Sequence, residues 1–267
     1  MKVIVYQSYS GPPPPPWLAR CRATVEAWAA DQGYDYDGDN DLYAFVPDWY
    51  GEKAGPFINV VADLARLTMA RHYLDQGYDR AIWLDADVVV FDPDRFRPDL
   101  AQSCLLCGEV WLDTDPDVDF GAGDLHCKRQ VTNSLTMFAA DNTFLDAYIE
   151  RCLAIVRDGP HPAPRLSVST HLLTSLAKTL TFPLVQDLAL ISPILMLGIA
   201  ESDPTILDLY ASHMAAPVRA ANLCLSFRGK HHKGIPVTDA LFDRTIDKLL
   251  ETQGHDINRA YHRRSYA

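Results

Sequence analysis

Short apolar segments alternate with longer amphipathic segments along most of the chain. Residues 2–7 and 81–84 are apolar runs of strand length, and residues 103–112 and 131–139 are two further apolar segments. Elsewhere apolar residues recur at helical spacing, which predicts helices over residues 17–32, 56–76, 141–156, 169–178 and 239–251. Strands that alternate with helices predict an α/β fold, with a mostly parallel central sheet flanked by helices.

Two aspartates follow the apolar run at residues 81–84, which reads Ala-Ile-Trp-Leu. Asp85 and Asp87 are separated by the small residue Ala86, and alternate residues of a strand point to the same side. Ligands of open α/β sheets bind at the carboxyl ends of the strands, which is where both aspartates are expected to lie. Hard carboxylate oxygens suit Mn²⁺ or Mg²⁺ that carries a diphosphate, so the sequence predicts a divalent-metal and diphosphate site here.

A basic segment far along the chain is the second candidate for chemistry. Residues 228–236 read Arg-Gly-Lys-His-His-Lys-Gly-Ile-Pro, so two imidazoles lie between Lys230 and Lys233. These side chains can complete the coordination of a metal and neutralise a diphosphate, and a solvated basic loop is the alternative. Adjacent residues usually point apart, so we expect only one of His231 and His232 to serve as a ligand.

The composition and charge of the chain limit the kinds of partner it can bind. The chain has 267 residues, of which 48% are hydrophobic, and a net charge of −11, which argues against general affinity for nucleic acid or anionic membranes. No apolar run reaches the roughly 18 residues of a membrane-spanning helix, and residues 1–6 read as a first strand rather than a signal peptide. The scattered cysteines suit reduced thiols in a cytoplasmic protein. Cys104, Cys107, His126 and Cys127 can be imagined as a zinc site, with buried core thiols as the alternative.

Several blocks occur in an order that is typical of one enzyme family. Residues 62–67 read Ala-Asp-Leu-Ala-Arg-Leu, residues 77–88 contain Gly-Tyr-Asp-Arg and Trp-Leu-Asp-Ala-Asp-Val, residues 132–138 read Thr-Asn-Ser-Leu-Thr-Met-Phe, and His231 precedes Gly234 by three positions. In these blocks the sequence resembles the GT-A glycosyltransferases, in particular the glycogenin and bacterial galactosyltransferase-like group. The Asp-Gln pair and terminal Lys-Pro-Trp of that group are missing, and in this the chain is similar to the wider set of small sugar transferases of polysaccharide synthesis.

The resemblance implies a single GT-A domain over residues 1–267. Residues 1–110 would form the nucleotide-sugar-binding half, residues 111–236 the acceptor-side half with the loop that completes the metal site, and residues 237–267 a C-terminal helix and tail. The implied activity is that of a metal-dependent hexosyltransferase, which moves a sugar from a nucleoside-diphosphate sugar, a UDP-sugar by expectation, to a hydroxyl acceptor. A glycan or lipid-linked glycan is the first expectation for the acceptor.

A modified DNA base is the second expectation for the acceptor. Residues 230–233 and the tail at 261–266, which reads Tyr-His-Arg-Arg-Ser-Tyr, could form one basic, aromatic patch on an acidic body. A frayed terminus is the alternative for the tail.

The resemblance also implies roles for individual residues. Asp85, Asp87 and His231 would hold Mn²⁺ or Mg²⁺, and Asn133 would lie near the donor sugar. The nucleotide sugar would be bound by Tyr6, Gln7, Ser8, Asp63, Arg66, Asp85, Ala86, Asp87, Lys230 and Lys233. We expect Arg66→Ala to weaken donor binding with little loss of stability, because Arg66 falls on the polar face of its helix.

An inverting transferase also needs a general base, which Asp113 or Asp115 can supply unless both belong to an acidic surface loop. His171 is a candidate near the acceptor, with a helix cap or surface group as its alternative.

Two other functions stay open. The sequence Asp-Ala-Asp-Val-Val at residues 85–89 also fits the nucleophile motif of haloacid dehalogenase-like phosphatases, although in that family the motif usually ends the first strand. A non-catalytic nucleotide-sugar-binding domain is the other alternative.

Overall fold

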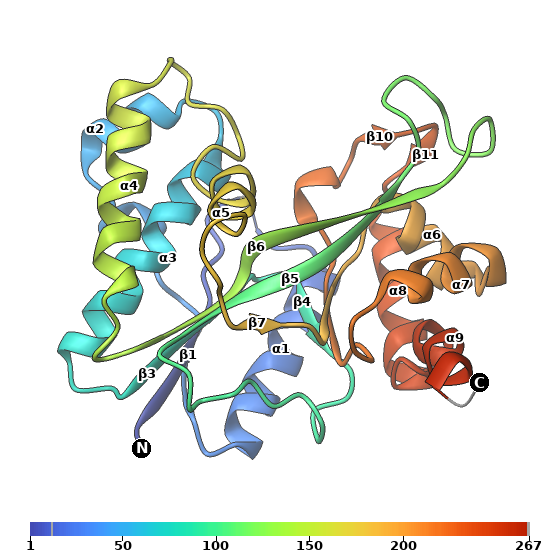
Figure 1. The fold of residues 1–267 in the computed structure, drawn as a ribbon, viewed down its shortest axis with the longest axis horizontal. Helices are drawn as coiled ribbons and strands as arrows, with labels where there is room; N and C mark the ends of the chain where they lie inside the picture. The colour runs from blue at the N-terminus through green and yellow to red at the C-terminus, as the bar shows by residue number, and fades with distance from the viewer. Residues whose placement is uncertain (12, 266–267) are drawn as a thin grey trace.

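The computed structural model describes residues 1–11 and 13–265 and is built around a six-stranded sheet (Figure 1). Its strands, in spatial order, are β2 (Asp35–Asp37), β1 (Val3–Tyr6), β3 (Arg80–Leu84), β6 (His126–Ala139), β5 (Cys104–Asp113) and β7 (Leu184–Val185). Strand β6 is antiparallel to both of its neighbours and the other pairings are parallel, so β6 alone among these described strands runs opposite to the rest. The predicted α/β fold with a mostly parallel sheet is confirmed.

Helices cover both faces of this sheet because its strands bury side chains on both sides. The covering helices are α3 (Ile58–Asp75) and α4 (Phe144–Asp158) on one face and α1 (Pro16–Asp31) on the other. On β3, Trp83 packs in one apolar cluster with α3, and Leu84 packs in another with α1. A strand covered on both faces needs an unbroken apolar run, which is what preceded the two aspartates in the sequence.

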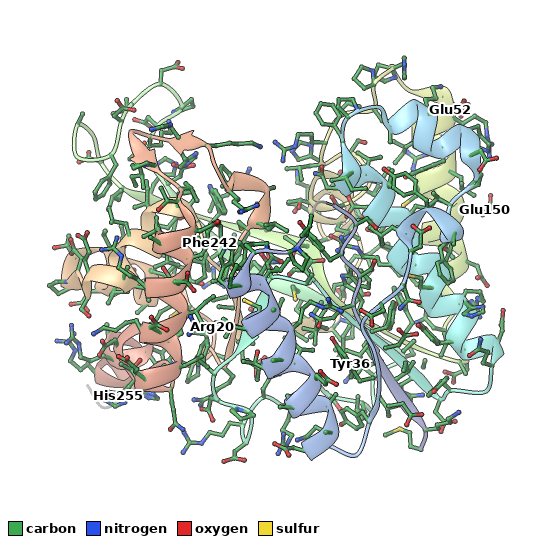
Figure 2. All side chains as sticks on the ribbon, turned by 180° about the vertical axis from the view of Figure 1, so that it is seen from behind. Arg20, Tyr36, Glu52, Glu150, Phe242 and His255 are labelled. Carbon is green, nitrogen blue, oxygen red and sulfur yellow. The ribbon has the colours of Figure 1, made fainter. Side chains whose placement is uncertain are left out.

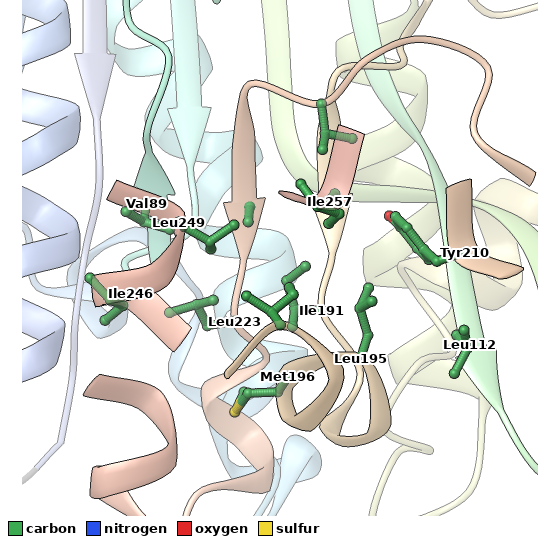
Figure 3. Close-up of a cluster of buried hydrophobic side chains, with 14 of the residues drawn as sticks. Val89, Leu112, Ile191, Leu195, Met196, Tyr210, Leu223, Ile246, Leu249 and Ile257 are labelled. Carbon is green, nitrogen blue, oxygen red and sulfur yellow. The ribbon is translucent and has the colours of Figure 1, made fainter. Parts of the chain in front are cut away.

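A smaller sheet and a group of helices form the C-terminal part (Figure 1). The sheet has the order β4 (Val88–Val90), β9 (Ala220–Asn222) and β8 (Leu188–Leu190), and the helices are α6 (Pro193–Glu201), α7 (Pro204–His213), α8 (Asp239–Thr252) and α9 (His255–Ser265). Val89, Leu223 and Leu249 meet in the apolar cluster between them (Figure 3). Since β4 begins directly after Asp87, this sheet positions the second aspartate.

Helix α1 joins the two parts of the molecule. Arg20 forms an ion pair with Asp243 of α8 at 3.0 Å, and Trp17 stacks on Phe242 with ring centroids 4.0 Å apart. Figure 2 shows Arg20 and Phe242 on these two facing helices. Val90 N of β4 also donates to Thr24 Oγ1 of α1 at 2.9 Å, so α1 connects the strand after the aspartates to the C-terminal helices.

All of the helices predicted from the sequence are present, with ends shifted by a few residues. They are α1, α3, α4, α5 (Thr170–Leu176) and α8. The sequence did not predict the short strands β2, β4, β7, β8 and β9, or the hairpin of β10 (His231–His232) and β11 (Ile235–Pro236). It also did not predict the helices α2 (Asp48–Ala54), α6, α7 and α9, or the 3-10 turns η1 (Leu42–Phe45) and η2 (Leu225–Phe227). Five consecutive prolines at residues 12–16 lead into α1, since Pro15 is its N-cap and Pro16 its first residue. Pro12 lies outside the described residues.

The zinc site considered for Cys104, Cys107, His126 and Cys127 is not formed. Cys104 and Cys107 lie on β5 in different apolar clusters, and all of the cysteines are free. Within residues 1–11 and 13–265, no three His, Cys, Asp or Glu side chains are gathered so that they could hold a metal ion by themselves. None of the helices described in this range is long and apolar enough to cross a membrane.

The C-terminal tail is helical and packs on α7 through an ion pair of Arg263 with Asp208 at 2.9 Å. Figure 1 places α9 and the hairpin β10–β11 at opposite ends of the C-terminal part, so the expected single basic patch is not formed. Tyr266, which belonged to that expectation, lies outside the described residues. The division of the chain at residues 110 and 236 stays a prediction.

Candidate active site at the end of strand β3

The two aspartates lie in the turn between β3 and β4. The Asp85 carboxylate accepts hydrogen bonds from Trp83 Nε1 at 2.8 Å and from Asn222 Nδ2 at 2.9 Å, and it pairs with Arg66 Nη1 at 3.1 Å. Trp83 and Arg66 contact Oδ1, whereas Asn222 contacts Oδ2. Because both oxygens have fixed partners, the first aspartate is held in one orientation.

Asp87 is more deeply buried, with 6% of its surface exposed. Its Oδ2 accepts a hydrogen bond from Leu225 N at 2.5 Å, which comes from η2. Burial and, next, the negative charge of Asp85 raise the pKa of Asp87 to about 7. The buried Asp87 and the half-buried Asp85, separated by one residue, therefore lack part of the positive charge that would balance them.

Arg66 supplies the positive charge that is present. Its side chain pairs with Asp63 Oδ1 at 3.3 Å and with Asp85, and Nη1 donates to Asn133 O at 2.5 Å. Arg66 is 5% exposed and Asp63 is 3% exposed, and burial raises the pKa of Asp63 to about 6. Arg66 is thus a buried charge at the centre of a network, which reverses the expectation that it can be removed with little loss of stability.

Strand β6 brings a second polar group to the same place. Asn133 Nδ2 donates to Asp63 Oδ1 at 3.0 Å, and Ser134 Oγ donates to Glu109 Oε1 of β5. Glu109 is 2% exposed, its Oε2 has no hydrogen-bond partner among the described residues, and burial raises its pKa to about 7. The sequence reading missed Glu109, although a lone carboxylate inside the apolar run at residues 103–112 was a signal for it.

Two adjoining cavities meet at this network. The larger cavity has a volume of about 700 Å³ and the smaller about 460 Å³. Arg66, Asp85, Asp87 and Arg165 line both of them. The aspartate pair therefore lies where a ligand that fills both cavities would cross from one to the other.

Of the residues at the carboxyl end of β1, Tyr6 and Gln7 contact the backbone of the site from the protein interior. Tyr6 Oη donates to Arg66 O at 2.7 Å, and Gln7 Nε2 donates to Asp85 O at 2.9 Å, while both side chains are fully buried. Ser8 and Ala86 line the smaller cavity. Tyr6 and Gln7 thus support the backbone of the site, whereas Ser8 and Ala86 border the smaller cavity and can contact a ligand there.

The four residues of the basic loop, 230–233, lie in different surroundings. Lys230 lines the smaller cavity, and the Lys233 ammonium donates to the carbonyl oxygens of Asp115 and Pro116, outside both cavities. His231 is exposed on β10 and lines neither cavity. His232 lines the larger cavity and donates from Nε2 to Asp113 Oδ1 at 3.1 Å. Neither imidazole is grouped with Asp85 and Asp87 as a three-ligand metal set in the part of the chain that the structure describes.

The other residues expected on the acceptor side line the larger cavity. His171 lies there at the start of α5, and Asp113 lies there at the end of β5. The Asp113 carboxylate accepts hydrogen bonds from Trp111 Nε1 at 3.0 Å and from Thr114 N at 2.9 Å in addition to that from His232. These donors occupy both of its oxygens, so in this geometry Asp113 orients its neighbours.

The donor set at Asp85 and Asp87 fits a hard divalent cation. Mg²⁺ and Mn²⁺ take carboxylate oxygens, and Mg²⁺ is commonly held by one or two carboxylates together with substrate phosphates and water. The raised pKa of Asp87 has its cause in burial and in the charge of Asp85, both of which a bound cation would offset. Two protein carboxylates beside an open cavity suit a metal that arrives with a phosphate ligand.

No protein-family model and no curated protein matches the chain. Solved structures are similar to it, and three of them have the following identity, coverage and TM-score. A glycosyltransferase involved in the glycosylation of the major capsid of PBCV-1 is 11% identical over 92% of this chain and 99% of that one, with a TM-score of 0.48. Mouse xyloside xylosyltransferase 1 is 8% identical over 84% and 98%, with a TM-score of 0.39. The galactosyltransferase LgtC, in complex with donor and acceptor sugar analogs, is 12% identical over 84% and 87%, with a TM-score of 0.41. Identities and TM-scores this low assign no function to the chain.

Proposed function

We propose that this chain is a metal-dependent glycosyltransferase of the GT-A type, which moves a sugar from a nucleoside-diphosphate sugar to a hydroxyl acceptor. The observation that carries the proposal is the pair of the half-buried Asp85 and the buried Asp87 at the meeting point of two cavities. A donor has two unequal ends, a nucleoside and a sugar, joined by a diphosphate that needs compensating positive charge. Cavities on both sides of a cation-binding carboxylate pair suit a ligand of that shape.

We place the nucleoside of the donor in the smaller cavity. It contains Ser8 and Ala86 beside the aspartates, and Lys230 and Arg165 bring cationic side chains to its wall. The donor sugar would then reach the larger cavity, where Asn133 and Glu109 are available to its hydroxyl groups. A UDP-sugar remains the expected donor.

Mn²⁺ or Mg²⁺ held by Asp87, with Asp85 as its second ligand or as a partner of the ribose, would stabilise the negative charge that develops on the leaving diphosphate. Asp87 has to lose its proton to bind a cation, and its pKa of about 7 puts that loss near neutral pH. Arg66, Trp83 and Asn222 hold Asp85 in place. The backbone of Leu225 holds Asp87, so η2 couples the loop before Lys230 to the site.

The phosphatase alternative fits the topology less well. The motif follows the third strand of the chain, whereas the phosphatase motif usually ends the first strand.

Turnover of the donor tests the proposal. Nucleoside-diphosphate sugars that differ in base and sugar are incubated with the protein and Mn²⁺, and release of the nucleoside diphosphate is measured. We expect release with at least one donor, loss of release in a chelator, and recovery with Mn²⁺ or Mg²⁺. Such turnover also separates the transferase from a non-catalytic nucleotide-sugar-binding domain.

Substitutions then locate the activity. Asp87→Asn should lower turnover by about 100-fold or more while circular dichroism shows an intact fold. Asp117→Asn is the matched control, because Asp117 is an exposed aspartate in the loop between β5 and β6. Full turnover of Asp87→Asn in the presence of a chelator would refute the proposal.

A further inference from the structure

The long ribbon of β5 and β6 presents a patterned face to the larger cavity. Glu109, Trp111 and Asp113 occur at alternate positions of β5 and all line the cavity. Val110 and Leu112, between them, lie in the apolar core on the other side. The ribbon thus has one apolar face, which packs on the C-terminal helices, and one face of polar and aromatic side chains.

The neighbouring strand adds polar groups to the same face. In the register of the pair, Glu109 lies opposite Gln130 and Trp111 lies opposite Lys128, and both partners also line the cavity. Directly opposed residues of an antiparallel pair point to the same side. From the aspartates outward, the wall of the cavity therefore runs from Glu109 and Gln130 to Trp111 and Lys128.

Aromatic rings gather at the outer end of this wall. Trp111 is stacked with Phe227 of η2 at a centroid distance of 5.8 Å and an interplanar angle of 26°. His232 meets the edge of Phe227 at 5.0 Å. Asp113 accepts from both Trp111 Nε1 and His232 Nε2, so one carboxylate fixes the orientation of two of the three rings. All three rings line the larger cavity and are only partly buried.

We propose that Trp111 and Phe227, framed by Lys128, Gln130 and His232, form the subsite for a saccharide acceptor. This inference rests on the proposed function, since it places the acceptor in the cavity on the far side of the aspartates from the nucleoside. A sugar ring has an apolar face of C–H groups and a rim of hydroxyl groups. Aromatic rings suit the first, and the amide, ammonium and imidazole groups around them suit the second.

The charge of the surroundings favours a saccharide over a nucleic-acid base. A nucleobase can also stack on aromatic rings, but its strand brings a row of phosphates. Both signs of charge line the cavity, with the carboxylates Asp63, Asp85, Asp87, Glu109 and Asp113 beside the cations Arg66, Lys128, Arg165 and Lys178. The cavity therefore offers no excess of positive charge to a row of phosphates, and the chain as a whole carries a net charge of −11. A glycan with few or no charges does not need such an excess.

Equilibrium binding tests the subsite separately from catalysis. Maltose, cellobiose, lactose, digalacturonic acid and a single-stranded oligodeoxynucleotide are titrated into the wild-type protein, and binding is followed by saturation-transfer NMR and calorimetry. At least one saccharide should bind. Trp111→Leu, which keeps an apolar side chain without the aromatic face, and Phe227→Ala should each raise its dissociation constant about fivefold to tenfold, the range that one aromatic contact supplies.

Trp49→Ala is the matched control, because Trp49 is a partly exposed tryptophan on α2 that lines neither cavity. It should bind the saccharide as the wild type does. Binding of none of the saccharides, or equal binding by Trp111→Leu and Trp49→Ala, would overturn the inference. Binding of the oligodeoxynucleotide alone, lost in Trp111→Leu, would overturn it in favour of a nucleic-acid acceptor.

Donor turnover by the wild-type protein keeps the two proposals apart. Saccharide binding that depends on Trp111, in a protein that turns over no donor, would support the subsite and refute the transferase. Donor turnover in a protein that binds no saccharide would support the transferase and refute the subsite.

Discussion

Replacement of Arg66 by alanine is expected to destabilise the fold as well as the site. The substitution removes the guanidinium group that lies 3.3 Å from Asp63 and 3.1 Å from Asp85 and that donates to Asn133 O at 2.5 Å. Asp63 is almost fully enclosed, so its carboxylate would lose its cationic partner without gaining water. An uncompensated buried charge is among the most destabilising changes that one substitution can make.

The size of the effect follows from the burial of the pair. Breaking a buried ion pair by removing one partner costs about 3–5 kcal/mol. In a chain of this length that corresponds to a fall in melting temperature of about 10 °C. The cost should be larger at about pH 8 than at about pH 5, because burial already raises the pKa of Asp63 to about 6 and protonation removes the unpaired charge.

Urea and thermal denaturation at both pH values measure this effect. Arg71→Ala is the matched control, since Arg71 lies on the same helix and forms an exposed ion pair with Asp146 at 2.7 Å. That variant should lose less than about 1 kcal/mol. The double variant Arg66→Ala/Asp63→Asn should recover part of the stability that Arg66→Ala loses. Equal losses for Arg66→Ala and Arg71→Ala would refute the buried-network reasoning.

Three further results are expected. Because the folded pKa of Asp87 is about 7 and that of an unfolded aspartate is about 4, the metal-free protein should lose stability as pH rises between these values, and urea melts of Asp87→Asn should show a smaller fall. Lys230→Ala should weaken binding of a nucleoside diphosphate in calorimetry, whereas Lys233→Ala should leave that affinity unchanged, because Lys233 is bonded to loop carbonyls outside the site. Gly254→Ala should destabilise the protein by more than about 1 kcal/mol in thermal melts, since Gly254 has φ +69° and a Cβ there would lie 2.2 Å from Phe91.

Local patterns in the sequence were sufficient to predict the elements at the centre of the candidate site. An apolar run followed by two alternate aspartates predicted a buried strand with two carboxylates at its end. The buried strand is β3, but it ends at Leu84, so Asp85 and Asp87 lie in the turn after it rather than on the strand itself. The helix that carries Asp63 and Arg66 was predicted from its period, and its polar positions do face the aspartates. Both predictions needed only the neighbours of each residue along the chain.

The rest of the site depends on contacts between distant segments. Asn222 reaches Asp85 across 137 positions through the pairing of β9 with β4, and no periodicity in the sequence indicates that pairing. For a similar reason, the sequence did not indicate which residues of the basic loop line the cavities and which do not. The hairpin β10–β11 turns His232 toward Asp113 and leaves His231 exposed, which follows from the register of the hairpin rather than from composition. Which imidazole, if either, approaches a bound metal stays a prediction.

Binding of Mn²⁺ in the presence of a nucleoside diphosphate tests the central proposal most directly. Free Mn²⁺ has a sharp electron paramagnetic resonance signal, and its loss can be titrated with wild-type protein, Asp87→Asn and the control Asp117→Asn, each with UDP or GDP. We expect the wild type and Asp117→Asn to remove the free signal, more strongly when the diphosphate is present, and Asp87→Asn to leave most of it. Identical titration curves for all three proteins would contradict a metal and diphosphate site at Asp85 and Asp87.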